Sequence, residues 1–155
     1  MPQNLRVLLV EDSEDDALLM LRELRRYGYS VICDRIDTAQ AMIRALDSNG
    51  YDIILSDFAL PHFSGEEALK IFSQYNLDIP LIIVSGKIGE EKAVALMKAG
   101  AYDYVPKTAL SRLVPAVERA LDEAGARRMR RQADEERENL IYAYSARLKE
   151  LGALE

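Results

Sequence analysis

Short apolar runs alternate along the chain with longer stretches in which apolar residues recur every three or four positions. A short continuous apolar run is typical of a strand buried on both faces, and the longer spacing is typical of an amphipathic helix. The pattern predicts five strands, at residues 6–10, 31–36, 52–57, 81–85 and 101–105. It predicts helices at residues 13–27, 37–49, 64–75 and 90–99, and a last helix that begins near residues 110–115.

Each predicted strand is followed by a predicted helix, so the chain consists of five strand–helix units in series. Such alternation is typical of an α/β fold with a parallel sheet and helices on both of its faces. The second strand is less apolar than the others, which favours a place near an edge of the sheet. Two sequences, residues 37–40 and 64–67, resemble helix capping boxes.

The C-terminal region has a different character, because residues 116–155 lack proline and are rich in strong helix formers. As one helix, residues 116–151 would span about 54 Å, more than packing on a small sheet requires. We expect a first domain at residues 1–122 and a helical extension at residues 123–155 that serves as a linker or a coiled coil. A 3-4-3 spacing, that of a coiled-coil seam, makes a homodimer through this helix one expectation. The spacing is formed by Ile141, Tyr144, Leu148 and Leu151.

Composition and charge exclude several classes of protein. The 155 residues include 20 lysines and arginines and 26 acidic residues, for a formal net charge of −6, so we expect no direct nucleic-acid binding. One cysteine excludes an intrachain disulfide and a cysteine-rich zinc site, and one histidine excludes a multi-histidine metal centre. No apolar run is long enough to cross a bilayer, and the N-terminus lacks the pattern of a signal peptide. We expect a cytoplasmic protein with no membrane segment.

Polar residues stand where the predicted strands end. They are Glu11 and Asp12 after the first strand, Asp57 at the end of the third, Ser85 at the end of the fourth and Lys107 after the fifth. The carboxyl ends of parallel strands meet at one edge of a sheet, so we expect these groups to converge. Carboxylates packed together repel one another unless a cation lies among them, and oxygen ligands alone favour Mg²⁺ or Mn²⁺.

Phosphoryl chemistry suits this set of groups. Mg²⁺ keeps open positions for phosphate oxygens and would draw a phosphoryl donor toward Asp57. A carboxylate can attack phosphorus to form an aspartyl phosphate, with Ser85 and Lys107 holding the new phosphoryl oxygens. Taken singly, these residues have ordinary structural explanations. The acidic run after the first strand, for example, suits a helix N-terminus. The joint placement at four strand ends carries the inference.

Four motifs in order resemble the receiver domain of two-component response regulators. They are Val10-Glu11-Asp12-Ser13, Ser56-Asp57-Phe58-Ala59-Leu60-Pro61 with Gly65, Val84-Ser85-Gly86, and Asp103-Tyr104-Val105-Pro106-Lys107. The spacings between Asp12, Asp57, Ser85 and Lys107 are 45, 28 and 22 residues. The resemblance covers residues 5–121 and implies a flavodoxin-like, doubly wound sheet of five parallel strands in the order 2-1-3-4-5.

The resemblance also implies a role for each residue of the site. Asp57 would be the phosphoacceptor and would bind Mg²⁺ together with Asp12. Glu11 would reach the metal through water, and Ala59 would supply its backbone carbonyl. The implied phosphoryl donor is a phosphohistidine on a histidine kinase or a histidine phosphotransfer protein.

Ser85 and Lys107 would hold the phosphoryl group, and Tyr104 resembles the switch aromatic that turns inward as the Ser85 hydroxyl moves toward the phosphate. The element that switches would be the face around the fourth helix and the fifth strand. The family often has proline directly after the lysine, with a cis peptide bond. Here Thr108 follows Lys107 and Pro106 precedes it, so the isomer at this point stays open.

Two other functions stay open beside a phosphoryl-accepting signalling domain. A phosphorylation-independent interaction module would have no need of Ser85 and Lys107. A small-molecule phosphatase with Asp57 as nucleophile usually has a second acid two residues later, where this chain has Ala59. We therefore expect a signalling domain rather than an enzyme.

Overall fold

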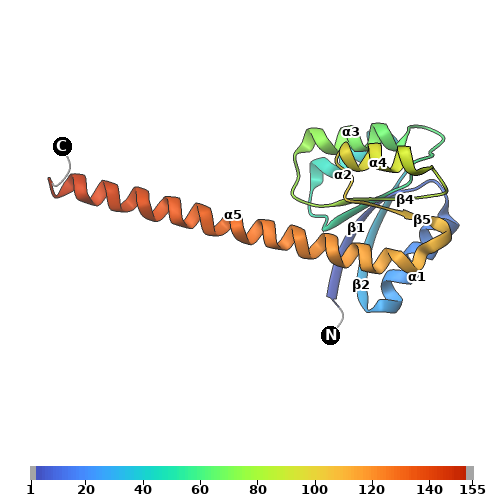
Figure 1. Cartoon of the computed structure of the whole chain (residues 1–155), viewed down its shortest axis with the longest axis horizontal. Coiled ribbons are helices and arrows are strands. Elements are labelled where there is room, and N and C mark those ends of the chain that lie inside the picture. Colours follow the sequence, from blue (N-terminus) through green and yellow to red (C-terminus); the bar gives the residue numbers. More distant parts are fainter. Residues whose placement is uncertain (1–2, 153–155) are drawn as a thin grey trace. The chain divides into compact units, whose positions relative to one another are not determined.

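The structure, a computed structural model, describes residues 3–152. Five strands form one parallel sheet in the order β2-β1-β3-β4-β5, which confirms the implied topology (Figure 1). The strands are β1 (Gln3–Val10), β2 (Tyr29–Ile36), β3 (Ile53–Ser56), β4 (Leu81–Ser85) and β5 (Asp103–Pro106). The helices are α1 (Glu14–Tyr27), α2 (Ala39–Ser48), α3 (Gly65–Tyr75), α4 (Glu90–Lys98), the 3₁₀ helix η1 (Lys107–Arg112) and α5 (Leu113–Glu150).

The observed strands differ from the predicted ones at their ends. β1 begins at Gln3 rather than at residue 6 because it pairs with β2 along its whole length, from Gln3 opposite Tyr29 to Val10 opposite Ile36. Hydrophobicity alone could not reveal Gln3 and Asn4, since both are polar. β2 lies at an edge of the sheet, as its weaker apolar pattern predicted.

Each face of the sheet carries its own buried cluster. α1 and the first turns of α5 cover one face, while α2, α3 and α4 cover the other (Figure 1). β3 and β4 lie between these layers, and all of their residues are buried. This double burial explains why their sequences are continuous apolar runs rather than alternating ones.

The capping boxes predicted at residues 37–40 and 64–67 can be compared with the observed starts of α2 and α3. Ser64 and Glu67 form the reciprocal box of α3, in which each side chain accepts the backbone N–H of the other residue. In α2 the cap residue was predicted one position too early. Thr38, rather than Asp37, accepts the backbone N–H of Ala41 at 3.1 Å, because Thr38 has the extended backbone that an N-cap requires.

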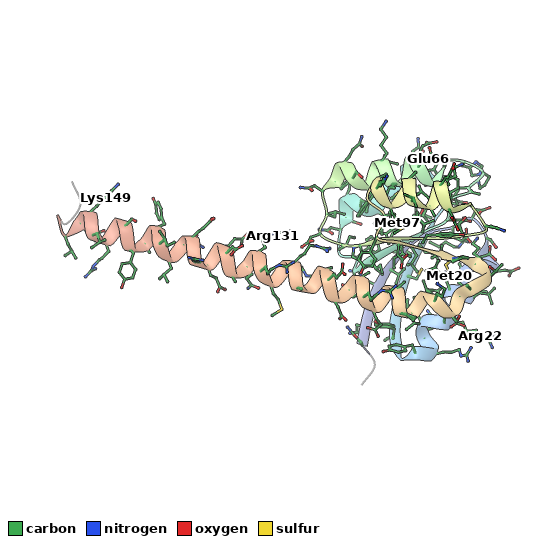
Figure 2. All side chains as sticks on the ribbon, viewed as in Figure 1. Met20, Arg22, Glu66, Met97, Arg131 and Lys149 are labelled. Carbon is green, nitrogen blue, oxygen red and sulfur yellow. The ribbon has the colours of Figure 1, made fainter. Side chains whose placement is uncertain are left out.

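By its internal contacts the chain divides into two compact units, Met1–Leu121 and Asp122–Glu155. α5 is a helix of 38 residues. In the second unit every residue from 128 to 152 is exposed, and side chains such as Arg131 and Lys149 extend outward from the helix (Figure 2). Among residues 3–152, no helix has both the length and the apolar character needed to cross a membrane.

The peptide bonds around Lys107 are trans, as are all others in the described part of the chain. Pro106 is the last residue of β5 and stands opposite Ser85 of β4. Lys107 then begins η1, so the lysine lies where the strand passes directly into helical structure.

Gly65, the first residue of α3, lies against the backbone that leaves β3. A Cβ at this position would lie 2.7 Å from Cα of Phe58 and 3.1 Å from the carbonyl oxygen of Asp57. The Gly65 backbone N–H donates to the Phe58 carbonyl at 2.8 Å. The missing side chain therefore allows α3 to begin in direct contact with the loop that follows Asp57.

We expect Gly65→Ala to lower the free energy of unfolding by about 2 kcal/mol, because the added methyl group meets backbone that must shift. Gly86→Ala is the matched control, since a Cβ there meets nothing within 4 Å. The control should stay within about 0.5 kcal/mol of the parent protein. Urea unfolding followed by circular dichroism measures both variants, and equal stabilities would contradict the close contact.

Candidate functional site

Carboxylates gather at the carboxyl ends of β1 and β3. Glu11 and Asp12 follow β1, and Asp57 follows β3, which pairs directly with β1. Each of the three offers a carboxylate oxygen within 4.8 Å of the others. Glu11 is completely buried and Asp57 is 6% exposed, whereas Asp12 is open to solvent. The predicted convergence of these strand ends is thus present in the structure.

Three groups hold the side chain of Asp57. The Ser85 hydroxyl, at the end of β4, donates to Oδ1 at 2.6 Å. The backbone N–H of Ala59 donates to the same oxygen at 3.3 Å, and Lys107 Nζ donates to Oδ2 at 2.9 Å. Burial alone would raise the pKa of Asp57, but the hydrogen bonds from Ser85 and Lys107 outweigh it and hold the pKa below its usual value. Asp57 is therefore a buried carboxylate that stays ionised.

Lys107 contacts three carboxylates at once. Its Nζ lies 2.5 Å from Glu11 Oε1, 2.7 Å from Asp16 Oδ2 and 2.9 Å from Asp57 Oδ2. Burial by itself would lower the pKa of Lys107, but these three bonds outweigh it and raise the pKa above its ordinary value. The lysine is therefore a fixed positive charge at neutral pH.

The Glu11 side chain is the least satisfied group of the site. Oε1 accepts from Lys107, but Oε2 is buried and has no hydrogen-bond partner. Burial, the largest cause, raises the pKa of Glu11 to about 8, and the neighbouring Asp57 adds to the effect. An orphaned buried carboxylate oxygen beside two further carboxylates fits a hard divalent cation such as Mg²⁺. The donor set is all oxygen, as such an ion prefers.

Tyr104 lies apart from this hydrogen-bond network. Its hydroxyl donates to the backbone carbonyl of Gly86 at 2.7 Å, in the loop that follows β4. Ser85, one residue earlier, points the other way and bonds to Asp57. The two residues of the expected switch pair therefore lie on neighbouring strands, β4 and β5, and their hydroxyl groups donate to different partners.

Two residues of the site had no role assigned from the sequence. Asp16, in the first turn of α1, accepts from Lys107 Nζ at 2.7 Å. It belongs to the acidic run that follows the first strand, which by itself suits a helix N-terminus. Arg35, in β2, donates to the backbone carbonyls of Glu11 and Asp12 at 3.2 and 3.5 Å. No sequence pattern marks this role of Arg35, because its partners are backbone atoms of the segment that follows β1.

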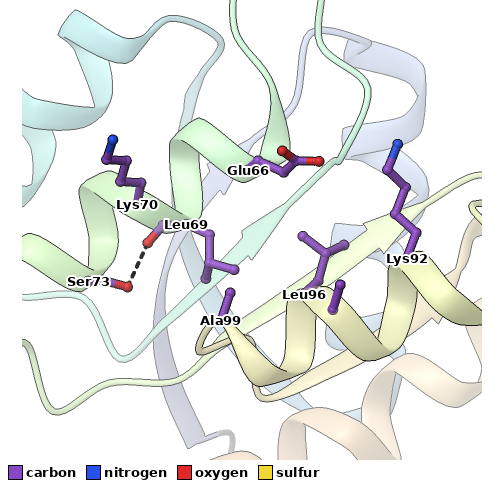
Figure 3. Close-up of a pocket in the computed structure, with 8 residues that line it drawn as sticks. Glu66, Leu69, Lys70, Ser73, Lys92, Leu96 and Ala99 are labelled. Atoms are coloured by element: carbon purple, nitrogen blue, oxygen red, sulfur yellow. Dashed lines mark hydrogen bonds between the residues drawn. The ribbon is translucent and has the colours of Figure 1, made fainter.

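A groove of about 480 Å³ lies between α3 and α4, away from the carboxylates (Figure 3). Its floor is apolar, with Leu69 and Leu96, and Lys92 lies at its rim. Lys92 Nζ also lies 4.6 Å from the centroid of the Phe58 ring, a cation–π contact with the residue directly after Asp57. The groove is therefore linked to the site through one aromatic side chain.

Residues 7–118 match the family model described as the response regulator receiver domain. The chain belongs to this family. Among curated relatives, the DNA-binding transcriptional regulator NtrC of Proteus hauseri is 27% identical over 150 residues, which cover 96% of this chain and 30% of that protein. The transcriptional regulatory protein RprY of Bacteroides fragilis is 31% identical over 107 residues, which cover 69% of this chain and 44% of that protein. The chain thus spans less than half the length of either relative.

Solved receiver structures are similar to this one. The signal receiver domain of a putative LuxO repressor protein from Vibrio parahaemolyticus has a TM-score of 0.72 and 28% identity. The match covers 81% of this chain and 96% of that one. A receiver domain is the phosphoacceptor signalling module of a two-component response regulator, and the cluster of Glu11, Asp12 and Asp57 fits a phosphorylation site.

The raised pKa of Glu11 leads us to expect that the stability of the metal-free receiver domain depends on pH. Its pKa is raised from 4.5 to about 8, so between these pH values the folded state keeps a proton that the unfolded chain releases. The free energy of unfolding should therefore fall as the pH rises from 5 to about 8, by at most about 1.4 kcal/mol per pH unit. Urea unfolding in EDTA at a series of pH values measures this slope.

Glu11→Gln is the control for this effect, because the amide keeps the shape but does not titrate. Asp57 does not interfere, since its pKa is held low and its titration lies below this window. We expect the slope between pH 5 and about 8 to flatten in the variant. A slope that the substitution leaves unchanged would assign the pH dependence to another group.

Proposed function

We propose that this receiver domain accepts a phosphoryl group on Asp57 from a phosphohistidine of a histidine kinase or a histidine phosphotransfer protein. The observation that carries the proposal is the state of Asp57, a buried carboxylate kept ionised by Ser85 and Lys107. An ionised oxygen is a nucleophile, whereas burial alone would favour the neutral acid.

Glu11, Asp12 and Asp57, with the backbone carbonyl of Ala59, would hold Mg²⁺. When bound, this ion neutralises charge on the phosphoryl oxygens as they approach the carboxylates. The close carboxylate oxygens and the orphaned Oε2 of Glu11 support this assignment. Arg35 supports it indirectly, because its bonds to the Glu11 and Asp12 carbonyls fix the backbone that presents both side chains.

In the transfer, an oxygen of Asp57 forms a bond to phosphorus while the bond between phosphorus and the donor imidazole nitrogen breaks. The bonding electron pair returns to the imidazole, which takes up a proton from solvent. Ser85 and Lys107 donate to Asp57 in the unphosphorylated protein. After the transfer they would donate to the phosphoryl oxygens. The chain needs no general acid of its own for this step.

The same transfer would start the conformational switch. If the Ser85 hydroxyl moves to a phosphoryl oxygen, the loop after β4 moves with it, and that loop carries the Gly86 carbonyl that holds the Tyr104 hydroxyl. Release of this bond frees Tyr104 to turn inward. The face of α4 and β5 would then differ between the two states, which is what a downstream partner can recognise.

The main test is intact mass after incubation with acetyl phosphate and Mg²⁺. We expect the mass of one added phosphoryl group, lost in Asp57→Asn and in the presence of EDTA. Asp52→Asn is a matched control, since Asp52 lies at the opposite end of β3, where it bonds to the Arg6 backbone. This control should keep the adduct.

The alternatives give different results in the same experiment. Repeated release of phosphate from small esters, without a stable adduct, would favour a phosphatase. Neither an adduct nor turnover would favour a phosphorylation-independent interaction module and would overturn the proposal. Ala59 counts against the phosphatase, because it offers only backbone groups where a general acid is needed.

We further propose that a second copy of the chain covers one face of the helical unit. Every residue of the 3-4-3 seam is exposed, although such residues are usually buried against a partner. The seam consists of Ile141, Tyr144, Leu148 and Leu151, with exposed fractions of 58%, 67%, 37% and 68%. The curated relatives are longer than this chain, so the helix could equally connect the receiver domain to an output module.

Leu148→Glu should convert a dimer to a monomer, because it places a charge in the centre of the seam. Tyr142→Glu is the matched control, since Tyr142 is 78% exposed and lies outside the seam. Size-exclusion chromatography with light scattering over a range of concentrations measures the mass. A monomeric parent protein, or equal dissociation of both variants, would contradict pairing through this face and leave the linker role.

A further inference from the structure

The ammonium group of Lys107 uses all of its hydrogen-bonding capacity. A lysine has three N–H donors and no acceptor. Its three partners here are Glu11 Oε1, Asp16 Oδ2 and Asp57 Oδ2, at 2.5, 2.7 and 2.9 Å. The side chain is 22% exposed, so the protein rather than water supplies its partners.

Two of these three partners have other tasks in the proposed function. Asp57 changes from a carboxylate to an acyl phosphate, and Glu11 faces the proposed metal position with its unpartnered oxygen. Asp16 has neither task, because it is not part of the carboxylate group that could hold a metal. It is the one partner of Lys107 that stays the same before and after phosphoryl transfer.

The position of Asp16 on α1 makes it a rigid anchor. Ser13 caps the helix and accepts the Asp16 backbone N–H at 3.2 Å, which fixes the first turn. A charge that only complements the helix dipole would need no distant partner, and Glu14 and Asp15 already supply such charge in the same turn. The bond from Asp16 to Lys107 instead joins residues 91 positions apart in the chain.

We propose that Asp16 is a positioning residue for phosphoryl transfer, which holds the Lys107 ammonium group beside Asp57 while the other two partners change. With Asp16 in place, one N–H of Lys107 is fixed, so the remaining donors keep their direction toward Asp57. Without it, the flexible four-carbon side chain of lysine keeps only Glu11 and Asp57 as partners, both of which take part in the proposed chemistry. This inference rests on the proposed role of Asp57.

The test compares Asp16→Asn with Asp15→Asn, which removes the same charge from the exposed neighbouring position of the same helical turn. The rate of phosphorylation by acetyl phosphate is measured at saturating Mg²⁺, so that a change in metal affinity does not enter. We expect a roughly tenfold slower rate for Asp16→Asn, because a misplaced catalytic group is costly. The Asp15→Asn rate should stay within about twofold of the parent rate, and Asp16→Glu should recover most of the loss.

A second readout follows Lys107 itself, by the exchange of its ammonium protons with water in nitrogen-15 NMR spectra, with Lys107→Arg to assign the signal. We expect faster exchange in Asp16→Asn only. Equal rates and equal exchange in the Asp16 and Asp15 variants would overturn the proposal. If the parent protein accepts no phosphoryl group, the proposed function fails, but the exchange measurement still decides whether Asp16 holds Lys107.

Discussion

A single half-buried ammonium group, that of Lys107, lies among the carboxylates at the carboxyl edge of the sheet. Lys107 Nζ donates to both Glu11 and Asp57, which are buried where little water can screen a charge. The bond between Lys107 and Glu11 joins residues 96 positions apart. It can form only because β1 and β5, the first and last strands along the chain, end at the same edge of the sheet. The parallel topology therefore brings Lys107 to Asp57, and the bond from Lys107 helps to keep Asp57 ionised.

Much of the fold could be predicted because burial on both faces leaves a plain signal in the sequence. β3 and β4 are continuous apolar runs, and the carboxyl ends of parallel strands lie at the same edge of a sheet. The sequence therefore predicts that Asp57, Ser85 and Lys107 lie together, as they do. The bond between Asp16 and Lys107 could not be predicted, because a carboxylate in the first turn of a helix has a sufficient local explanation. Arg35 could not either, since it binds backbone carbonyls that any sequence would offer.

The loop after β3 ties the site to two helices. Gly65 lets α3 begin against the Phe58 backbone, and Lys92 of α4 lies over the Phe58 ring. Phe58 directly follows Asp57 in the chain, so the contacts of one residue connect the site with both helices.

The three bonds of Lys107 also have a consequence for chemical selectivity. An acyl phosphate such as acetyl phosphate carries two electrophilic centres, phosphorus and the carbonyl carbon. An amine attacks the carbonyl carbon only in its neutral form, and the raised pKa of Lys107 keeps that form scarce. The carboxylate network thus shields the lysine from acetylation by the same reagent that can phosphorylate the neighbouring aspartate.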